Sequence, residues 1–350
     1  MLYNQNRTMK ALQDKRPYIA AASLCVAGII AIAYYYFFTG FSATGETRYI
    51  CIDVDDTVDS VFSKLSPHAK SSAMTALGTL LRHDNYKEAV RTGRYAIKGD
   101  DSVLSMFRKL RNGRQEPLRL TIPESRTPEL LASALGRKLM ADSASIMRVL
   151  NDSAAVARLG YDSATVIALF IPNTYEVYWD TSIDNLLQRM KKENAAFWNY
   201  ARTQKAQALG MTPVAVQTLA SIIDEETSKN DEKAMIAGMY INRLKKGMPL
   251  QADPTVKFAL GDFTLRRIYQ DMLRTDSPYN TYRYPGLPPG PIKIASVAGI
   301  DAVLNYAHHD YLYMCAKEDF SGRHNFAKTY NEHLANAQRY ARALNERGIK

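Results

Sequence analysis

The chain has 350 residues, a formal net charge of +10 and 46% hydrophobic residues. This length exceeds one typical hydrophobic core and predicts two domains outside any membrane segment. The positive charge would suit nucleic acid in a cytoplasmic protein, but the chain has no arginine-rich arm and no aromatic nucleic-acid signature, so we expect no nucleic acid as partner. The six histidines show no HExxH or comparable spacing, so we expect no metal and no cofactor.

The first predicted element is an uncharged apolar segment from Tyr18 to Phe38. At about 1.5 Å per residue it would reach roughly 31 Å, enough to cross the hydrocarbon core of a bilayer. Basic residues dominate before the segment and acidic residues after it, so the positive-inside rule places residues 1–17 in the cytoplasm as a short tail. We therefore expect a single-pass protein of the inner (cytoplasmic) membrane, with the rest of the chain outside, in the periplasm. Anionic lipid surfaces and acidic wall polymers are then the counterparts of its positive charge.

Two other interpretations of this segment stay open. A cleavable signal peptide could end at 31–33, but the aromatic run 34–38 extends the apolar segment beyond that point and fits a membrane interface. A lipoprotein would use Cys25, but Leu24 is too large for the residue before such a cleavage site. An uncleaved transmembrane anchor over 18–38 is the interpretation that we favour.

An internal repeat organises residues 45–122. A predicted strand, an acidic turn and an amphipathic helix recur about 45 residues later, and Asn112-Gly113 ends the second helix. The repeat consists of strands 48–54 and 94–97 and helices 58–65 and 103–110, and a third strand–turn–helix follows over 118–139. Such units resemble LysM modules, which bind glycans, so we expect a LysM-like α/β subdomain over 45–122. A spacer that packs against the next domain is the alternative.

The rest of the chain, residues 123–350, is expected to form one mainly helical domain with short strands. Loops 276–282 and 286–291 are rich in proline and glycine, which fixes a backbone rigidly, as a groove for a polar substrate requires. A purely structural proline loop fits the same pattern. The predicted fold class is α+β, and the helices expected here span 141–159, 184–209, 213–226 and 232–246.

The most informative helix is 213–226, which a hydroxyl N-cap and a proline at the first position open. Leu219, Ile222 and Ile223 form an apolar stripe, and the next position on that stripe is Glu226. Burial raises the pKa of a carboxyl group, and a carboxylic acid that stays protonated near neutral pH can act as a general acid. The alternative is a glutamate that snorkels from the stripe edge or pairs with an arginine. The two acidic residues directly before it are expected on wetter faces of the helix.

The second half of the chain carries a series of motifs, at 219–227, 250–256, 277–282 and 286–292 among others. Together they resemble the MltG-type (YceG-like) endolytic murein transglycosylases. The resemblance covers residues from about 165 to 335 in order and extends loosely over the LysM-like region. Its motifs are 219–227 with Glu232, 241–244, 247–248, 250–256, 277–282, 286–292 and 322–326 with Thr329, Glu332 and His333.

The resemblance implies roles for individual residues. The catalytic glutamate of the family lies directly before the threonine of its motif, which matches Glu226, while the shorter Asp224 at the earlier acidic position argues against a catalytic role there. Glu232 is expected at a helix start, either as a cap or as a residue that orients the site. The chain departs from the family in segment 293–296, where the family usually has Asn or Thr followed by Pro-Gly. Ile294 therefore offers no polar side chain for the substrate hydrogen bond that the family would make in this segment.

The reaction implied by the family is cleavage of the MurNAc–GlcNAc β-1,4 bond of nascent peptidoglycan strands without water, leaving 1,6-anhydro-MurNAc ends. Glu226 would protonate the leaving oxygen and then accept the proton of the MurNAc C6 hydroxyl as it attacks C1. We expect Gln251, Asp253, Asn280 and Tyr282 to bind the sugars. The implied partners are glycan strands and cell-wall synthases.

Two other functions stay open. A non-catalytic, membrane-anchored wall-binding or scaffold protein would keep the groove and the anchor. A muramidase-type hydrolase would need a second carboxylate, for which Asp253 is the candidate.

Overall fold

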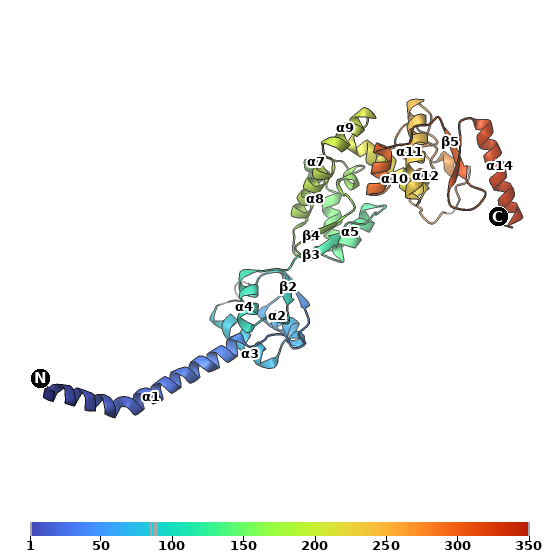
Figure 1. Cartoon of the computed structure of the whole chain (residues 1–350). Helices are drawn as coiled ribbons and strands as arrows, with labels where there is room; N and C mark the ends of the chain where they lie inside the picture. Colours follow the sequence, from blue (N-terminus) through green and yellow to red (C-terminus); the bar gives the residue numbers. More distant parts are fainter. Residues whose placement is uncertain (1, 85, 87–89, 266, 349–350) are drawn as a thin grey trace. The chain divides into compact units, whose positions relative to one another are not determined.

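The computed structural model describes residues 2–84, 86, 90–265 and 267–348. It is a mixed, mainly helical fold with few short strands (Figure 1). In this respect it agrees with the predicted α+β class. Contacts divide the chain into two compact units, Met1–Leu118 with Val177–Asp180 and Arg119–Glu176 with Thr181–Lys350. The elements of the first unit are α1 (Leu2–Phe38), β1 (Arg48–Ile52), α2 (Val58–Leu65), η1 (Ser66–His68), α3 (Ser71–His83), β2 (Gly93–Ile97) and α4 (Val103–Asn112).

The later elements begin with β3 and β4, which pair with each other and through which the chain passes between the units. Their bounds, and those of the elements that follow, are β3 (Leu118–Thr121), α5 (Pro128–Gly136), α6 (Ser143–Leu150), α7 (Ser153–Leu159), η3 (Val166–Leu169), β4 (Thr174–Val177), α8 (Ile183–Phe197), α9 (Tyr200–Ala208), α10 (Pro213–Glu226), α11 (Asn230–Lys245), α12 (Asp253–Leu260), η4 (Met272–Arg274), α13 (Val297–Leu304), β5 (Tyr313–Ala316), β6 (His324–Ala327) and α14 (Tyr330–Glu346).

Helix α1 contains a segment long and apolar enough to cross a membrane. This segment is Pro17–Phe38, with a mean hydropathy of 1.9, and none of it is buried inside the protein. Its side chains are exposed along most of its length, and Tyr36 near its end is partly covered by the core of the first unit. Exposed apolar side chains are what a lipid-facing helix presents. The helix is therefore consistent with a single-pass membrane anchor.

The two predicted repeats of the first unit pair with each other. Strands β1 and β2 are antiparallel, and Ile50 faces Tyr95, its own counterpart 45 residues along the chain. Each copy also contains an equivalent ion pair: Lys64 bonds Asp56 in the first copy, and Lys109 bonds Asp101 in the second. The order β1, α2, α3, β2 brings this repeat together, while its LysM-like character stays a prediction.

Two of the predicted long helices are each broken in two. The helix expected over 141–159 is α6 followed by α7, because the carboxylate of Asp152 accepts hydrogen bonds from two backbone N–H groups and starts a new helix. The helix expected over 184–209 is α8 followed by α9, because Asn199 caps α9 in the same way. Apolar periodicity continued across both breaks, so the prediction of single helices was wrong.

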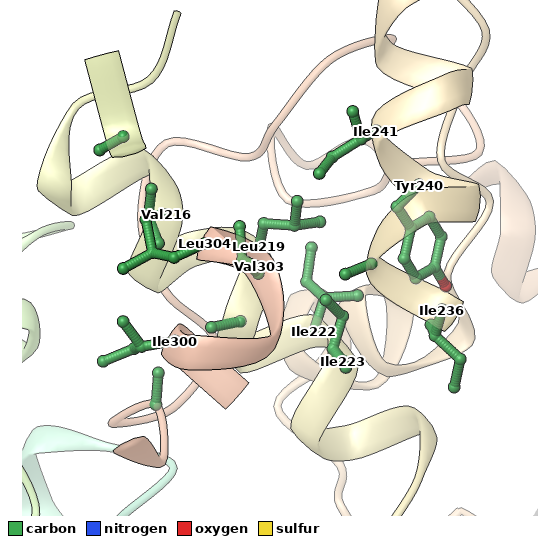
Figure 2. Packing of buried hydrophobic residues seen from close by; sticks show 14 of the residues in the cluster. Val216, Leu219, Ile222, Ile223, Ile236, Tyr240, Ile241, Ile300, Val303 and Leu304 are labelled. Atoms are coloured by element: carbon green, nitrogen blue, oxygen red, sulfur yellow. The ribbon is translucent and has the colours of Figure 1, made fainter. Parts of the chain in front are cut away.

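The core of the second unit forms around α10. Val216, Leu219, Ile222 and Ile223 on this helix are fully buried. They pack against α11 and α13, whose side chains Ile236, Ile241, Ile300 and Val303 close the cluster (Figure 2). The apolar stripe that the sequence predicted therefore faces a core on two sides, and this packing fixes where the C-terminal end of α10 lies.

Candidate active site

Glu226 is the last residue of α10 and stands where the apolar stripe of that helix leaves the core. Thr212 caps the start of α10 by accepting a hydrogen bond from Ala215 N at 3.1 Å, and Pro213 occupies the first turn, as predicted. Glu226 itself is partly buried, between the packed stripe and a pocket. The stripe thus delivers one carboxyl group to a cavity wall rather than to bulk water.

The environment of this carboxyl raises its pKa to about 7. Burial is the main cause, since desolvation disfavours the charged form. The hydroxyl of Tyr240, fully buried on α11, donates a hydrogen bond to Glu226 Oε1 at 2.8 Å and lowers the pKa in part, while the negative charge of Asp253 raises it again. A group with a pKa close to the working pH can release a proton readily and take one back, which suits one residue to act first as a general acid and then as a base.

The pocket beside Glu226 has a volume of about 480 Å³ and lies entirely in the second unit. Its wall combines aromatic rings with polar and charged groups, the lining expected for a polar ligand that also offers apolar faces. The lining residues are Glu226, Met239, Tyr240, Arg243, Leu250, Gln251, Asp253, Tyr282, Tyr313, Met314, Cys315, Ala316, His324, Tyr330 and His333.

Gln251, one of the predicted substrate-binding residues, lines this pocket in a strained backbone conformation. Its φ of 54° is in the left-handed region, which residues other than glycine rarely adopt. A backbone hydrogen bond to Thr281 O at 3.1 Å and a side-chain bond accepted from Arg243 hold it there. Arg243 is fixed in turn by Pro249 O at 2.8 Å and Leu312 O at 3.0 Å. Strain held by several bonds is common at binding sites, and here it keeps an amide on the pocket wall.

Asp253 and Tyr282 also line the pocket and are bonded to each other. The Tyr282 hydroxyl donates to Asp253 Oδ1 at 2.5 Å, and burial followed by this bond raises the pKa of Tyr282. Asn280 is placed differently. It is fully buried and its amide donates to Leu273 O and Thr275 O at 2.9 and 2.8 Å, so it is not among the described residues that line the pocket. Asn280 holds the loop that presents Tyr282, which replaces the direct sugar contact that we expected.

Glu232 does not cap its helix by a side-chain bond of its own; it joins α11 to β6. Its carboxylate is buried and accepts hydrogen bonds from His324 N at 2.8 Å and from Thr227 Oγ1 at 3.4 Å, and it lies 3.0 Å from His324 Nδ1. His324 lines the pocket, and Thr227 follows Glu226 directly. Of the two roles expected for Glu232, the structure therefore fits the orienting one, because it fixes a pocket-lining imidazole.

The expectation that Asp224 lies on a wet face of α10 was wrong. Only 2% of its side chain is exposed, and it pairs with Lys233 Nζ at 2.7 Å. Ser296 N and Oγ also donate to its carboxylate at 2.7 and 2.8 Å. Glu225 is mostly covered as well and pairs with Arg126. The loop before α13 covers this face of α10, which the helical period alone could not show.

Segment 293–296, where the chain departs from the family pattern, supports this back face of α10. Lys293 pairs with Glu124 at 3.1 Å and Glu225 at 3.4 Å, and Ile294 is buried. None of these four residues is among the described residues that line the pocket. The departure therefore changes the support of the helix rather than the wall that faces a ligand.

Several pocket residues were missed by the sequence reasoning. Tyr240 is separated from Glu226 by 14 residues on a neighbouring helix, a relation that no local pattern carries. Arg243, His324 and His333 belong to the motifs that carried the family resemblance, so those motifs could have suggested them. Tyr313 and Tyr330 belong to β5 and α14 and offer no signal of their own.

Known proteins match this chain over parts of different length. The model of the YceG-like family matches residues 50–339. An endolytic murein transglycosylase from Bacillus subtilis (strain 168) is 40% identical over 171 residues, which is 48% of this chain and 46% of the relative. One from Streptococcus pneumoniae serotype 2 is 26% identical over 289 residues, 73% of this chain and 51% of the relative. The chain thus spans about half the length of these curated relatives.

A solved structure is similar too. The crystal structure of a yceG-like protein from Listeria monocytogenes superposes with a TM-score of 0.55 at 27% identity, and the match covers 83% of this chain and 98% of that one.

Proposed function

The chain belongs to the YceG-like family, and from that membership together with the pocket around Glu226 we propose that it is a membrane-anchored endolytic peptidoglycan lytic transglycosylase. The observation that carries the proposal is the place of Glu226, which ends a packed helix on the wall of a pocket of about 480 Å³ and accepts a hydrogen bond from Tyr240. Burial there raises its pKa to about 7. Relatives whose matches cover 73% of this chain bear the name endolytic murein transglycosylase.

The proposed reaction uses one carboxyl group twice. Protonated Glu226 gives its proton to the glycosidic oxygen as the MurNAc–GlcNAc bond breaks, and the resulting carboxylate accepts the proton of the MurNAc C6 hydroxyl as that oxygen attacks C1. The product is a 1,6-anhydro-MurNAc end. Because nucleophile and electrophile belong to one sugar ring, orientation replaces the second carboxylate of an ordinary glycosidase.

Other pocket residues have proposed roles in binding. The amide of Gln251 and the hydroxyl of Tyr282 are held on the wall by bonds within the protein, so little side-chain entropy is lost when a sugar binds. Tyr240 lines the pocket but is almost completely buried, and its proposed role is to donate the hydrogen bond that orients Glu226. Asn280 acts through the loop that it holds.

A muramidase is the second candidate, and Asp253 is the observation that favours it. Its carboxylate lines the same pocket and its charge raises the pKa of Glu226, so the two groups are near enough to interact. In a hydrolase this second carboxylate would assist a water molecule or stabilise the sugar cation. The hydrogen bond that Asp253 accepts from Tyr282 occupies one of its carboxylate oxygens, which favours a role in sugar binding over a role in hydrolysis.

The first unit and α1 have a proposed role in placement. The span in α1 would hold the protein in the inner membrane with its N-terminus in the cytoplasm. The rest of the chain would then lie on the opposite side of the membrane, where newly made glycan strands emerge. The repeat over 45–122 is proposed as the glycan-binding, LysM-like part and residues 123–350 as the catalytic part. Cell-wall synthases are the proposed protein partners.

The test is digestion of purified peptidoglycan sacculi by the full chain in detergent, with products identified by mass spectrometry. Wild type should release anhydro-muramyl ends, Glu226→Gln should release none, and Glu129→Gln, the same chemical change at an exposed glutamate of α5, should behave as wild type. Reducing ends would identify a muramidase. Sacculi that bind but stay uncut would identify a wall-binding protein.

A further inference from the structure

A second cavity lies in the first unit, where the apolar span of α1 ends. It has a volume of about 320 Å³, and its wall includes Phe38, the last residue of the span. Arg108, Lys109 and Arg114 line it together with a single acidic residue, Glu116. Three cations and one anion therefore surround a hollow that begins at the end of a membrane helix.

Hydrogen bonds tie this cavity to the end of the span. Directly after Phe38, Val103 N donates to Thr39 O at 3.3 Å, and Phe41 N donates to Asp101 O at 2.6 Å. Helix α4, which carries Arg108 and Lys109, thus begins against the two or three residues that follow the span. Phe41 is fully buried in the core of the unit, so this junction is packed and cannot act as a free linker.

The height of the cavity follows from this junction. The polar layer on each side of a bilayer is roughly 5–8 Å thick, and the cavity shares a wall with the last residue of the span. With α1 in the membrane, the cavity opens at the level of the lipid headgroups.

The charges in the cavity differ in their partners. Lys109 bonds the buried carboxylate of Asp101, and Glu116 pairs with Lys98 at 3.4 Å. Arg108 and Arg114 are exposed, and within the described part of the chain neither side chain has an ion pair or hydrogen bond. Two guanidinium groups are therefore available for an outside ligand.

We propose that this cavity binds the phosphate headgroup of an anionic lipid in the membrane that holds α1. A guanidinium group matches phosphate oxygens with two parallel hydrogen bonds, and a cation near an anionic surface gains about fivefold in binding strength. Because the cavity is rigidly joined to the end of the span, the bound lipid fixes the height and rotation of the first unit above the bilayer. The proposal rests on the membrane anchor of the proposed function and is independent of the chemistry at Glu226.

The experiment uses the full chain reconstituted in nanodiscs with equal amounts of phosphatidylglycerol and phosphatidylcholine. After extraction, native mass spectrometry counts the lipids of each kind that stay bound. The test variant is Arg108→Gln/Arg114→Gln, and the matched control is Arg148→Gln/Arg158→Gln, which removes the same charge from exposed positions on α6 and α7.

Wild type and control should prefer phosphatidylglycerol, and the test variant should lose that preference by roughly thirtyfold, the combined effect of two arginines. Glu226→Gln, a change in the other unit, should keep the lipid preference of wild type, which separates this proposal from the catalytic one. Equal lipid preference in wild type and test variant would overturn the proposal, as would release of the lipid by millimolar inorganic phosphate. Dissociation of the wild-type protein from nanodiscs made of pure phosphatidylcholine would overturn the membrane anchor on which the proposal rests.

Discussion

Replacing Glu226 by glutamine should abolish cleavage and, at alkaline pH, stabilise the second unit. A pKa of about 7 in place of the ordinary 4.5 means that the ionised carboxyl costs about 3 kcal/mol more in the folded protein than in the unfolded chain. Between these two pH values the folded protein keeps a proton that the unfolded chain releases, so the free energy of unfolding falls as pH rises. Glutamine does not titrate and can still accept the hydrogen bond of Tyr240.

The expected difference can be measured by thermal unfolding of the full chain in detergent. Trp198 lies in the core of the second unit, and replacing Trp179, the other of the two tryptophans, by phenylalanine makes its fluorescence a probe of that unit. The free energy of unfolding of Glu226→Gln is compared with that of its parent at pH 4.5 and at pH 8. Between these two pH values the difference should grow in favour of the variant by up to about 3 kcal/mol, or roughly 6–12 °C in unfolding temperature for a unit of this size.

A matched control decides the interpretation. Glu129→Gln removes an exposed carboxyl from α5, so its unfolding temperature should follow that of the parent at every pH. If the curve of Glu226→Gln also ran parallel to the parent between pH 4.5 and 8, the carboxyl would not be held in a desolvating environment. The central argument for a general acid would then be refuted, whatever the effect of the variant on activity.

Three further outcomes are expected. Tyr240→Phe removes a hydrogen bond that favours the carboxylate of Glu226, so the alkaline limb of the pH–rate profile should move to higher pH, by about one unit or less; an unchanged limb would separate Tyr240 from the proton transfer. Asp253→Asn removes a charge that raises the same pKa, so that limb should move to lower pH while anhydro products persist; loss of all cleavage would favour a muramidase. Lys233→Met leaves the buried carboxylate of Asp224 without its cation and should lower the free energy of unfolding by about 3–5 kcal/mol. Thermal unfolding measures this loss, and adding Asp224→Asn should restore part of it. An unchanged unfolding temperature in Lys233→Met would contradict the prediction.

Sequence reasoning succeeded where the governing physics is local. The span of α1, the N-cap of α10 and the stripe leading to Glu226 depend on residues within a few positions of one another, and periodicity records them directly. The breaks after α6 and α8 are also local, and the caps Asp152 and Asn199 were visible in the sequence, but continuing apolar periodicity concealed them.

Tertiary structure alone decided which partners meet around the pocket. The bond from Tyr240 to Glu226 joins two helices, and the contact of Glu232 with His324 spans 92 residues, so neither leaves a periodic trace. Asn280 resembled a sugar-binding residue because its type is polar, yet its side chain satisfies two buried carbonyl groups. The sequence by itself determined that a carboxyl group would end the stripe of α10. The fold determined its proton affinity, because desolvation and neighbouring charges depend on every element packed around it.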